Sequence, residues 1–232
     1  MPIRAVAIDF AGTLTTSGRG RPDGHLVRRV LQTEFDTAVP DAFVRLFDAS
    51  FWTRYVECLS VTLPRLLADT ARETGLLLPD PESVAAALWQ VCGDHPVDAA
   101  AADAVRMLRD MGLTCVLASN TARPVAHRQA TLEAAGLGFM PLVCSSAIGV
   151  AKPFEGLYHH VIHAAGVPAE EMAFVGDQIL NDVRAPRDAG MRAVWVNRRL
   201  NGEGRPQNLA DGILMLSHVS QLPTAIGPLL AA

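Results

Sequence analysis

Five short apolar runs recur along the chain and alternate with amphipathic segments. The runs cover residues 3–9, 113–119, 141–145, 172–177 and 192–197. They are continuously apolar, which is typical of strands buried on both faces of a parallel sheet. Segments with helical spacing, each closed by a glycine, cover residues 101–112, 124–136, 154–166 and 182–190. The alternation predicts an α/β fold with a Rossmann-like, doubly wound parallel sheet.

One long stretch interrupts this alternation directly after the first predicted strand. Between Thr15 and His95 there is no apolar run of the same kind, and the helical candidates there cover residues 25–35, 51–75 and 81–93. We therefore expect an α-helical domain inserted into the α/β domain. The expected boundaries are 1–14 and 98–232 for the α/β core and 15–97 for the helical insertion, with linkers at 16–24 and 94–100.

Composition and charge narrow the class of protein. Half of the 232 residues are hydrophobic, which is enough for one sizeable core and a smaller second domain. The net charge of −4 offers no basic surface for nucleic acid and no polybasic segment for a membrane. No apolar run approaches the roughly 18 residues of a membrane helix, and the N-terminus lacks the features of a secretion signal. We expect a cytoplasmic protein, a monomer or homodimer, with a small-molecule substrate.

Polar residues gather where the predicted strands end. Asp9, Ser119, Asn120 and Asp177 each follow or close a strand, and the carboxyl edge of an open α/β sheet is where ligands bind. Carboxylates at Asp9 and Asp177 are suitable ligands for Mg²⁺. Asp9 is also placed to act as a nucleophile that forms an aspartyl-phosphate.

Two further residues fit the same chemistry. Lys152 is the only lysine of the chain, and Asp182 adds a third carboxylate. Lys152, together with Ser119 and Asn120, could hold the non-bridging oxygens of a phosphoryl group, because charge neutralisation is most of what phosphoryl transfer requires. The set therefore predicts a Mg²⁺-dependent enzyme acting on a small phosphorylated metabolite.

Four segments in order resemble the motifs of the haloacid dehalogenase superfamily. They are "DFAGTL" at 9–14, "LASNT" at 117–121, "KP" at 152–153 and "GDQILND" at 176–182, and the insertion is similar to the first type of helical cap in that family. The resemblance implies that the cap closes over the active site and helps to select the substrate. It also implies a role for each matching residue: Asp9 as nucleophile, Ser119 and Lys152 as phosphoryl ligands, Asp9, the main-chain carbonyl of Ala11 and Asp177 as Mg²⁺ ligands, and Asp182 as an outer or alternate ligand.

The chain departs from the family pattern at Ala11. Phosphatases of this family usually carry a second aspartate there as general acid and base, a role worth about 10²- to 10⁴-fold in rate. A phosphatase without it needs a good leaving group or a proton donor from the substrate or the insertion, such as Asp23 or His25. Three alternatives stay open: a phosphonatase-like C–P hydrolase, although the insertion has no lysine for the Schiff base, a metal-independent dehalogenase, and a ligand-binding member without hydrolytic activity.

Overall fold

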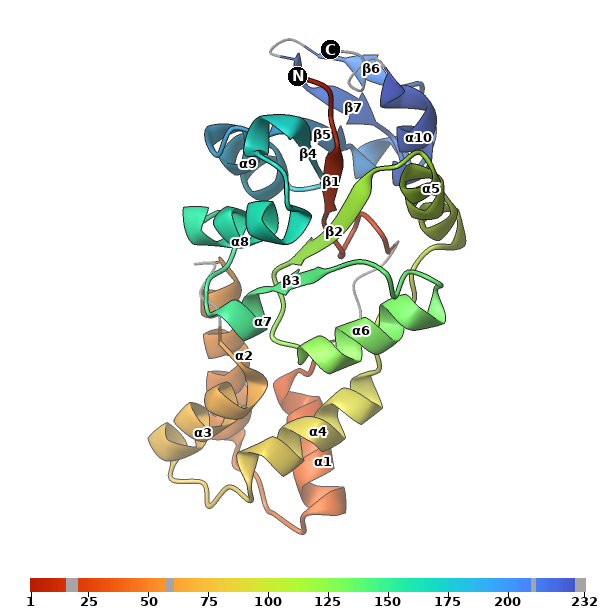
Figure 1. Ribbon diagram of the computed structural model, residues 1–232. Helices are drawn as coiled ribbons and strands as arrows, with labels where there is room; N and C mark the ends of the chain where they lie inside the picture. Colours follow the sequence, from red (N-terminus) through yellow and green to blue (C-terminus); the bar gives the residue numbers. More distant parts are fainter. Residues whose placement is uncertain (16–20, 57–60, 210–211, 228–232) are drawn as a thin grey trace.

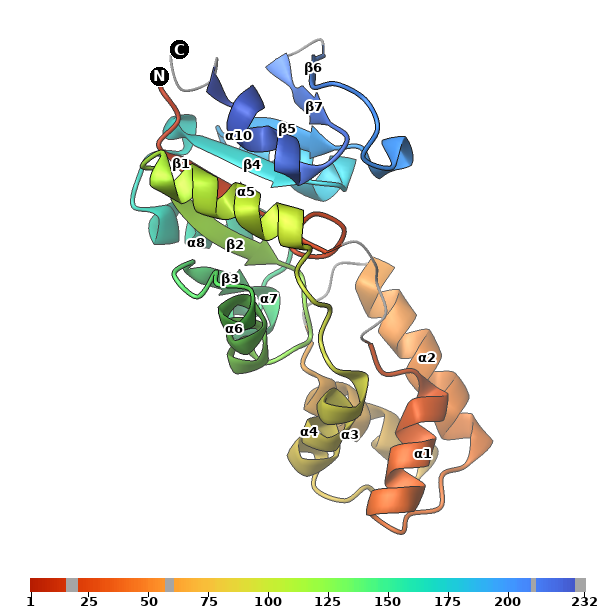
Figure 2. The same cartoon turned by 90° about the vertical axis from the view of Figure 1, so that its right-hand side faces the viewer.

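The computed structural model describes residues 1–15, 21–56, 61–209 and 212–227. Figures 1 and 2 show two parts joined end to end: a sheet flanked by helices, and a bundle of helices α1–α4. We call these the sheet unit and the helical unit. None of the helices within the described ranges is long and apolar enough to span a membrane.

The sheet confirms the predicted α/β fold. Its strand order is β3-β2-β1-β4-β5-β7-β6, and every neighbouring pair is parallel except β6 with β7. The first five strands in chain order match the five predicted runs, whereas β6 and β7 were not predicted. The strands are β1 (Ala5–Ile8), β2 (Thr114–Ser119), β3 (Leu142–Cys144), β4 (Met172–Gly176), β5 (Arg192–Val196), β6 (Gln207–Asn208) and β7 (Leu214–Leu216).

Helices cover both faces of the sheet, which explains why its strands are apolar throughout. In β1, Val6 and Ile8 pack into one hydrophobic cluster with α5, whereas Ala5 and Ala7 pack into another with α8. Alternate side chains of a strand point to opposite faces, so both faces must be apolar when both are covered. The helices of this unit are α5 (Ala99–Asp110), α6 (Val125–Ala134), α7 (Ser145–Ile148), α8 (Glu155–Ala165), α9 (Ala185–Asp188) and α10 (Leu222–Ala225).

Short helical turns connect several of these elements. A π-helical turn, η2 (Ile179–Arg184), precedes α9, so the helix predicted over 182–190 is a π-turn followed by a single α-helical turn. The 3₁₀ turns within the described part of the sheet unit include η1 (Ala169–Glu171), η3 (Arg198–Leu200) and η5 (Val219–Gln221). π-turns are rare and occur frequently at functional sites.

The helical unit lies between β1 and α5 in the sequence and has a hydrophobic cluster of its own. Its helices are α1 (Gly24–Glu34), α2 (Asp41–Val56), α3 (Leu63–Thr74) and α4 (Pro81–Cys92). The segment predicted as one helix over 51–75 contains the end of α2, which begins ten residues earlier, and a second helix, α3, which begins at Leu63. Residues 57–60 lie outside the described ranges. Pro64 stands in the first turn of α3, where its fixed φ and missing N–H favour a helix start.

Candidate active site

Asp9 directly follows β1, the strand between β2 and β4. Its backbone N–H donates to the carbonyl of Val175 at 2.9 Å, so its position is fixed by the neighbouring strand. After Phe10 the chain turns tightly, and Gly12 adopts a φ of +87°, which an L side chain rarely tolerates. The register of the three strands brings the residues that follow them to one edge of the sheet.

Lys152 joins two of the predicted site carboxylates. Its Nζ lies 2.7 Å from Oδ1 of Asp9 and 2.7 Å from Oδ1 of Asp182, and all three side chains are buried. Burial alone would lower the pKa of Lys152, but the carboxylates of Asp182 and Asp9 outweigh it and raise that pKa. Lys152 is therefore a fixed positive charge between the two carboxylates.

Three carboxylates form a group that could hold a divalent cation. Oxygens of Asp9, Asp177 and Asp182 lie within 4.8 Å of one another. Burial and the nearby Asp9 charge raise the pKa of Asp177, and burial raises the pKa of Asp182 to about 7 despite Lys152. Oδ1 of Asp177 is buried and has no hydrogen-bond partner in the part of the chain that the structure describes. Hard oxygen ligands with excess negative charge and an unpaired oxygen fit Mg²⁺.

Two glycines leave the space that these carboxylates occupy. A Cβ on Gly12 would come within 2.4 Å of Oδ2 of Asp177, and a Cβ on Gly176 would come within 2.3 Å of Cγ of Asp182. Both distances are far below van der Waals contact. The glycines of the first and last motifs are therefore required by the packing of the acidic group.

Ser119 and Asn120 lie at the end of β2, as predicted, but their surroundings differ. The Ser119 side chain is buried at the sheet edge, with Cys144 of β3 opposite in register. The Asn120 side chain holds the backbone of Lys152 at both of its polar groups: its Nδ2 donates to the Lys152 carbonyl at 2.9 Å, and its Oδ1 accepts from the Lys152 N–H at 2.7 Å. Its predicted role as a phosphoryl ligand stays a prediction, and its observed contacts are those of a residue that positions Lys152.

Ala11 lies in the turn after Asp9 and is exposed, with a backbone bridge to Thr15. Of the two proposed substitute proton donors, Asp23 is engaged as the N-cap of α1, where its Oδ1 accepts from the N–H of Leu26 at 2.8 Å. His25, two residues further on, is exposed. Both line a pocket of about 250 Å³ in the helical unit, together with Arg21, Pro22, Asp48 and Phe51.

Sequence reasoning missed Arg198, which lies beside the acidic group. It is the first residue of η3, just after β5, and its Nη1 is 3.4 Å from Oδ2 of Asp177. The available indication was its position directly after the strand predicted over 192–197, at the same sheet edge as Asp9 and Asp177.

A second group of charged residues, also missed, lies where the two units meet. Asp94 follows α4, and its carboxylate contacts Nη1 of Arg128 at 2.9 and 3.0 Å and Nε of Arg123 at 3.4 Å. The Thr131 hydroxyl donates to the same carboxylate at 2.8 Å. We call Asp94, Arg123, Arg128 and Thr131 the junction cluster. Its three charged side chains are each less than 10% exposed.

A buried lysine and three carboxylates at the carboxyl edge of a parallel sheet place the chain among the α/β enzymes that act at that edge. A family model for haloacid dehalogenase-like hydrolases matches residues 3–190. The chain belongs to this family, which confirms the resemblance of its motifs.

Relatives in sequence include phosphatases. The chain is 32% identical over 164 residues to a phosphoserine phosphatase of Thermus thermophilus, a match that covers 66% of this chain and 65% of that protein. It is 32% identical over 99 residues to the haloacid dehalogenase-like hydrolase domain-containing protein 3 of Xenopus laevis, covering 42% of this chain and 39% of that protein. The matches thus span less than two thirds of either relative.

Solved structures of similar fold include both dehalogenases and phosphatases. The 2-haloacid dehalogenase of Pseudomonas syringae pv. tomato superposes with a TM-score of 0.71 at 18% identity, covering 97% of this chain and 99% of that one. A HAD phosphatase of Thermococcus onnurineus gives a TM-score of 0.60 at 21% identity, covering 97% and 98%. At these identities the likeness establishes the shared fold of the whole chain.

Proposed function

We propose that the protein is a Mg²⁺-dependent phosphatase of small phosphorylated metabolites that works through an aspartyl-phosphate at Asp9. The observation that carries this proposal is the acidic group: Lys152 pairs with Asp9 and Asp182, while Asp177 keeps a buried oxygen without a partner among the described residues. This arrangement would let a divalent cation bind beside Asp9. The phosphatase relatives support the same activity.

The proposed roles follow from the contacts. Asp9, Asp177 and the carbonyl of Ala11 would hold Mg²⁺, with Asp182 as an outer ligand, and the bound ion would neutralise charge on the phosphoryl oxygens. Because Oδ1 of Asp9 accepts from Lys152, Oδ2 is the oxygen left to attack phosphorus. The P–O bond to the leaving group breaks with its electron pair on the leaving oxygen, and water then hydrolyses the aspartyl-phosphate. Ser119 and Lys152 orient the phosphoryl group throughout.

The helical unit is proposed to act as the cap that selects the substrate, with boundaries near residues 15 and 97. Its position between β1 and α5 in the sequence, its separate hydrophobic cluster and its own pocket support this division. The name of the Thermus relative makes phosphoserine one candidate substrate. Phosphoserine is an alkyl phosphate ester, so its leaving group is an alkoxide that needs protonation. It is therefore the kind of substrate most affected by Ala11 at the position of the usual general acid.

Leaving-group dependence tests the proposal directly. Phosphate release with Mg²⁺ should be at least about 10²-fold faster from aryl and acyl phosphates than from alkyl phosphates, because general acid catalysis is worth about 10²- to 10⁴-fold. Asp9→Asn should abolish release, chelation with EDTA should do the same, and Ala11→Asp should narrow the gap. Asp188→Asn, which changes an acidic residue in α9 outside the acidic group, is the matched control for Asp9→Asn.

Opposite results would assign another activity. Halide release from 2-haloacids without added metal, in the absence of phosphate release, would identify a dehalogenase and overturn the proposal. Equal rates on aryl and alkyl phosphates would show that another proton donor replaces the residue missing at position 11. Binding of phosphorylated ligands without turnover would identify a non-hydrolytic protein.

A further inference from the structure

The backbone at the end of β5 places Arg198 beside the acidic group. The strand ends at Val196, and η3 begins with Arg198 two residues later. Nη1 of Arg198 lies 3.4 Å from Oδ2 of Asp177, and Nε1 of Trp195 on the same segment donates to the Asp177 carbonyl at 3.2 Å. One segment therefore contacts Asp177 at both its backbone and its side chain.

The guanidinium group also lies against the turn that follows Asp9. A Cβ added to Gly12 would be 2.8 Å from Nη1 of Arg198 and 2.4 Å from Oδ2 of Asp177. Arg198 thus approaches the carboxylate from the side of the turn that carries Ala11 and Gly12. The absence of a side chain at Gly12 is what permits this approach.

Charge explains why an arginine is useful at this position. Lys152 contacts Asp9 and Asp182, whereas among the described residues Arg198 is the cation that contacts Asp177. The guanidinium group keeps its charge at all ordinary pH values. It therefore stabilises the ionised form of Asp177, whereas burial and the nearby Asp9 charge disfavour that form and raise the pKa of Asp177. The Arg198 side chain is 51% exposed whereas that of Asp177 is 12% exposed, so the arginine can leave toward solvent while the carboxylate stays.

We propose that Arg198 is a place-holding cation that pairs with Asp177 in the metal-free protein and competes with Mg²⁺ for that carboxylate. The inference rests on the proposed function, since it assumes that Asp177 is a Mg²⁺ ligand. Arg198 is in this view a positioning residue that sets metal affinity. Its removal should tighten Mg²⁺ binding, because both the competing contact and the repulsion between two cations are lost.

Mg²⁺ affinity without substrate is the decisive measurement. Isothermal titration with MgCl₂ at constant ionic strength compares the wild type with Arg198→Gln, Arg198→Lys and Arg199→Gln. Arg199 is the matched control, because it is the adjacent exposed arginine and its substitution changes the net charge equally. Arg198→Gln should lower the Kd about 5-fold, equivalent to about 1 kcal/mol, whereas Arg199→Gln and Arg198→Lys should stay within about 2-fold of the wild type.

The sign of the change separates the proposal from a structural role. If Arg198 instead orients the Asp177 carboxylate for metal binding, Arg198→Gln would weaken Mg²⁺ binding, and that result would overturn the inference. An unchanged Kd would overturn it as well. A wild type that hydrolyses phosphate esters with Mg²⁺ while Arg198→Gln binds the ion normally refutes this inference alone. A wild type that shows no Mg²⁺ binding refutes both this inference and the proposed function.

Discussion

Replacing Asp94 by Asn removes the negative charge at the centre of the junction cluster while keeping the shape of the side chain. The guanidinium of Arg128 packs 3.4 Å from the centroid of the Phe10 ring, the residue after Asp9, and that of Arg123 packs 4.3 Å from the centroid of the Trp89 ring in α4. Asp94 is therefore the anion between Arg128, which packs on the turn after Asp9, and Arg123, which packs on the helical unit. Without it, two buried arginines face each other with no counter-charge in the cluster.

The magnitude follows from burial. The side chains of Asp94, Arg123 and Arg128 are 9%, 4% and 6% exposed, so solvent cannot compensate for the lost charge. Removing one partner of a buried ion pair costs about 3–5 kcal/mol. The amide oxygen of Asn keeps one acceptor for Arg128, so we expect the lower end, about 3 kcal/mol. For a chain of this size, about 2–4 °C of melting temperature is lost per kcal/mol, which gives a decrease of about 6–12 °C.

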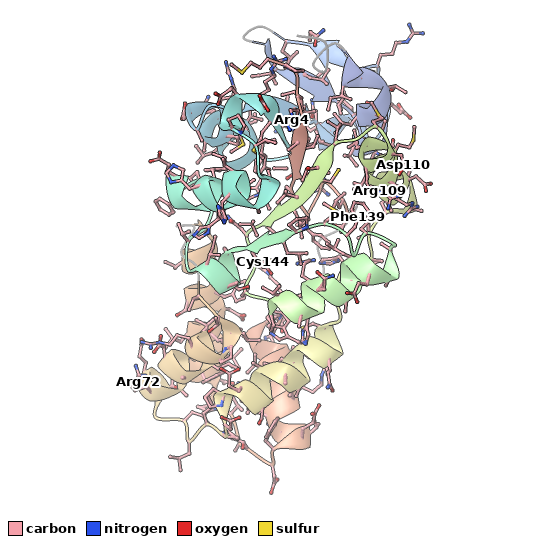
Figure 3. The ribbon with its side chains drawn as sticks, in the orientation of Figure 1. Arg4, Arg72, Arg109, Asp110, Phe139 and Cys144 are labelled. Carbon is pink, nitrogen blue, oxygen red and sulfur yellow. The ribbon has the colours of Figure 1, made fainter. Side chains whose placement is uncertain are left out.

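Thermal and urea unfolding followed by circular dichroism measure this loss. Asp110→Asn is the control: Asp110 and Arg109 lie at the end of α5 (Figure 3). Their side chains pair there and are 65% and 47% exposed. That surface pair is worth less than about 1 kcal/mol. Adding Arg123→Met to Asp94→Asn should recover part of the loss by removing one uncompensated cation. A decrease below about 1 kcal/mol for Asp94→Asn would refute the reasoning.

Two substitutions test the support of the site itself. Gly12→Ala should weaken Mg²⁺ binding at least about tenfold in calorimetric titration, because its Cβ would overlap Oδ2 of Asp177. Gly75→Ala, at φ +68° with open space around it, is the control for backbone strain alone, and equal metal affinity in both variants would contradict the overlap argument. Asn120→Ala should lower kcat at least about tenfold with a smaller change in KM, because Lys152 loses both backbone contacts and about 1–3 kcal/mol of positioning. A kcat unchanged from the wild type would show that Lys152 is held in place without Asn120.

The sheet and most of the acidic group could be predicted because the relevant information is local. Strands covered on both faces must be apolar throughout, so each central strand is recognisable without knowing its neighbours. Once the strands are assigned, parallel packing brings Asp9 and Asp177 to one edge, and the structure places them together with Asp182. Strand β7 was missed although the run at 213–216 is apolar throughout and no shorter than the apolar stretch Leu142–Cys144 that indicated β3.

The first half of α2 and the junction cluster were not predicted, for different reasons. The first half of α2 did carry an indication, since Phe43, Val44 and Phe47 are spaced for one helix face and are all buried. The junction cluster carried none, because arginine is mostly a surface residue and 29 positions separate Asp94 from Arg123 in the sequence. Its burial depends on how the helical unit meets the sheet unit.

The geometry sharpens what the missing aspartate at position 11 means for the chemistry. Lys152 is held between two carboxylates that raise its pKa, so it is a poor proton donor, and the guanidinium of Arg198 does not deprotonate. With a divalent cation bound, Asp177 and Asp182 would be ionised and could only accept hydrogen bonds. On the proposed function, the groups in contact at this edge would therefore neutralise charge on a phosphoryl group far better than they would protonate a leaving group. We expect the choice of substrate to be set by the acidity of the leaving group as much as by the shape of the helical unit.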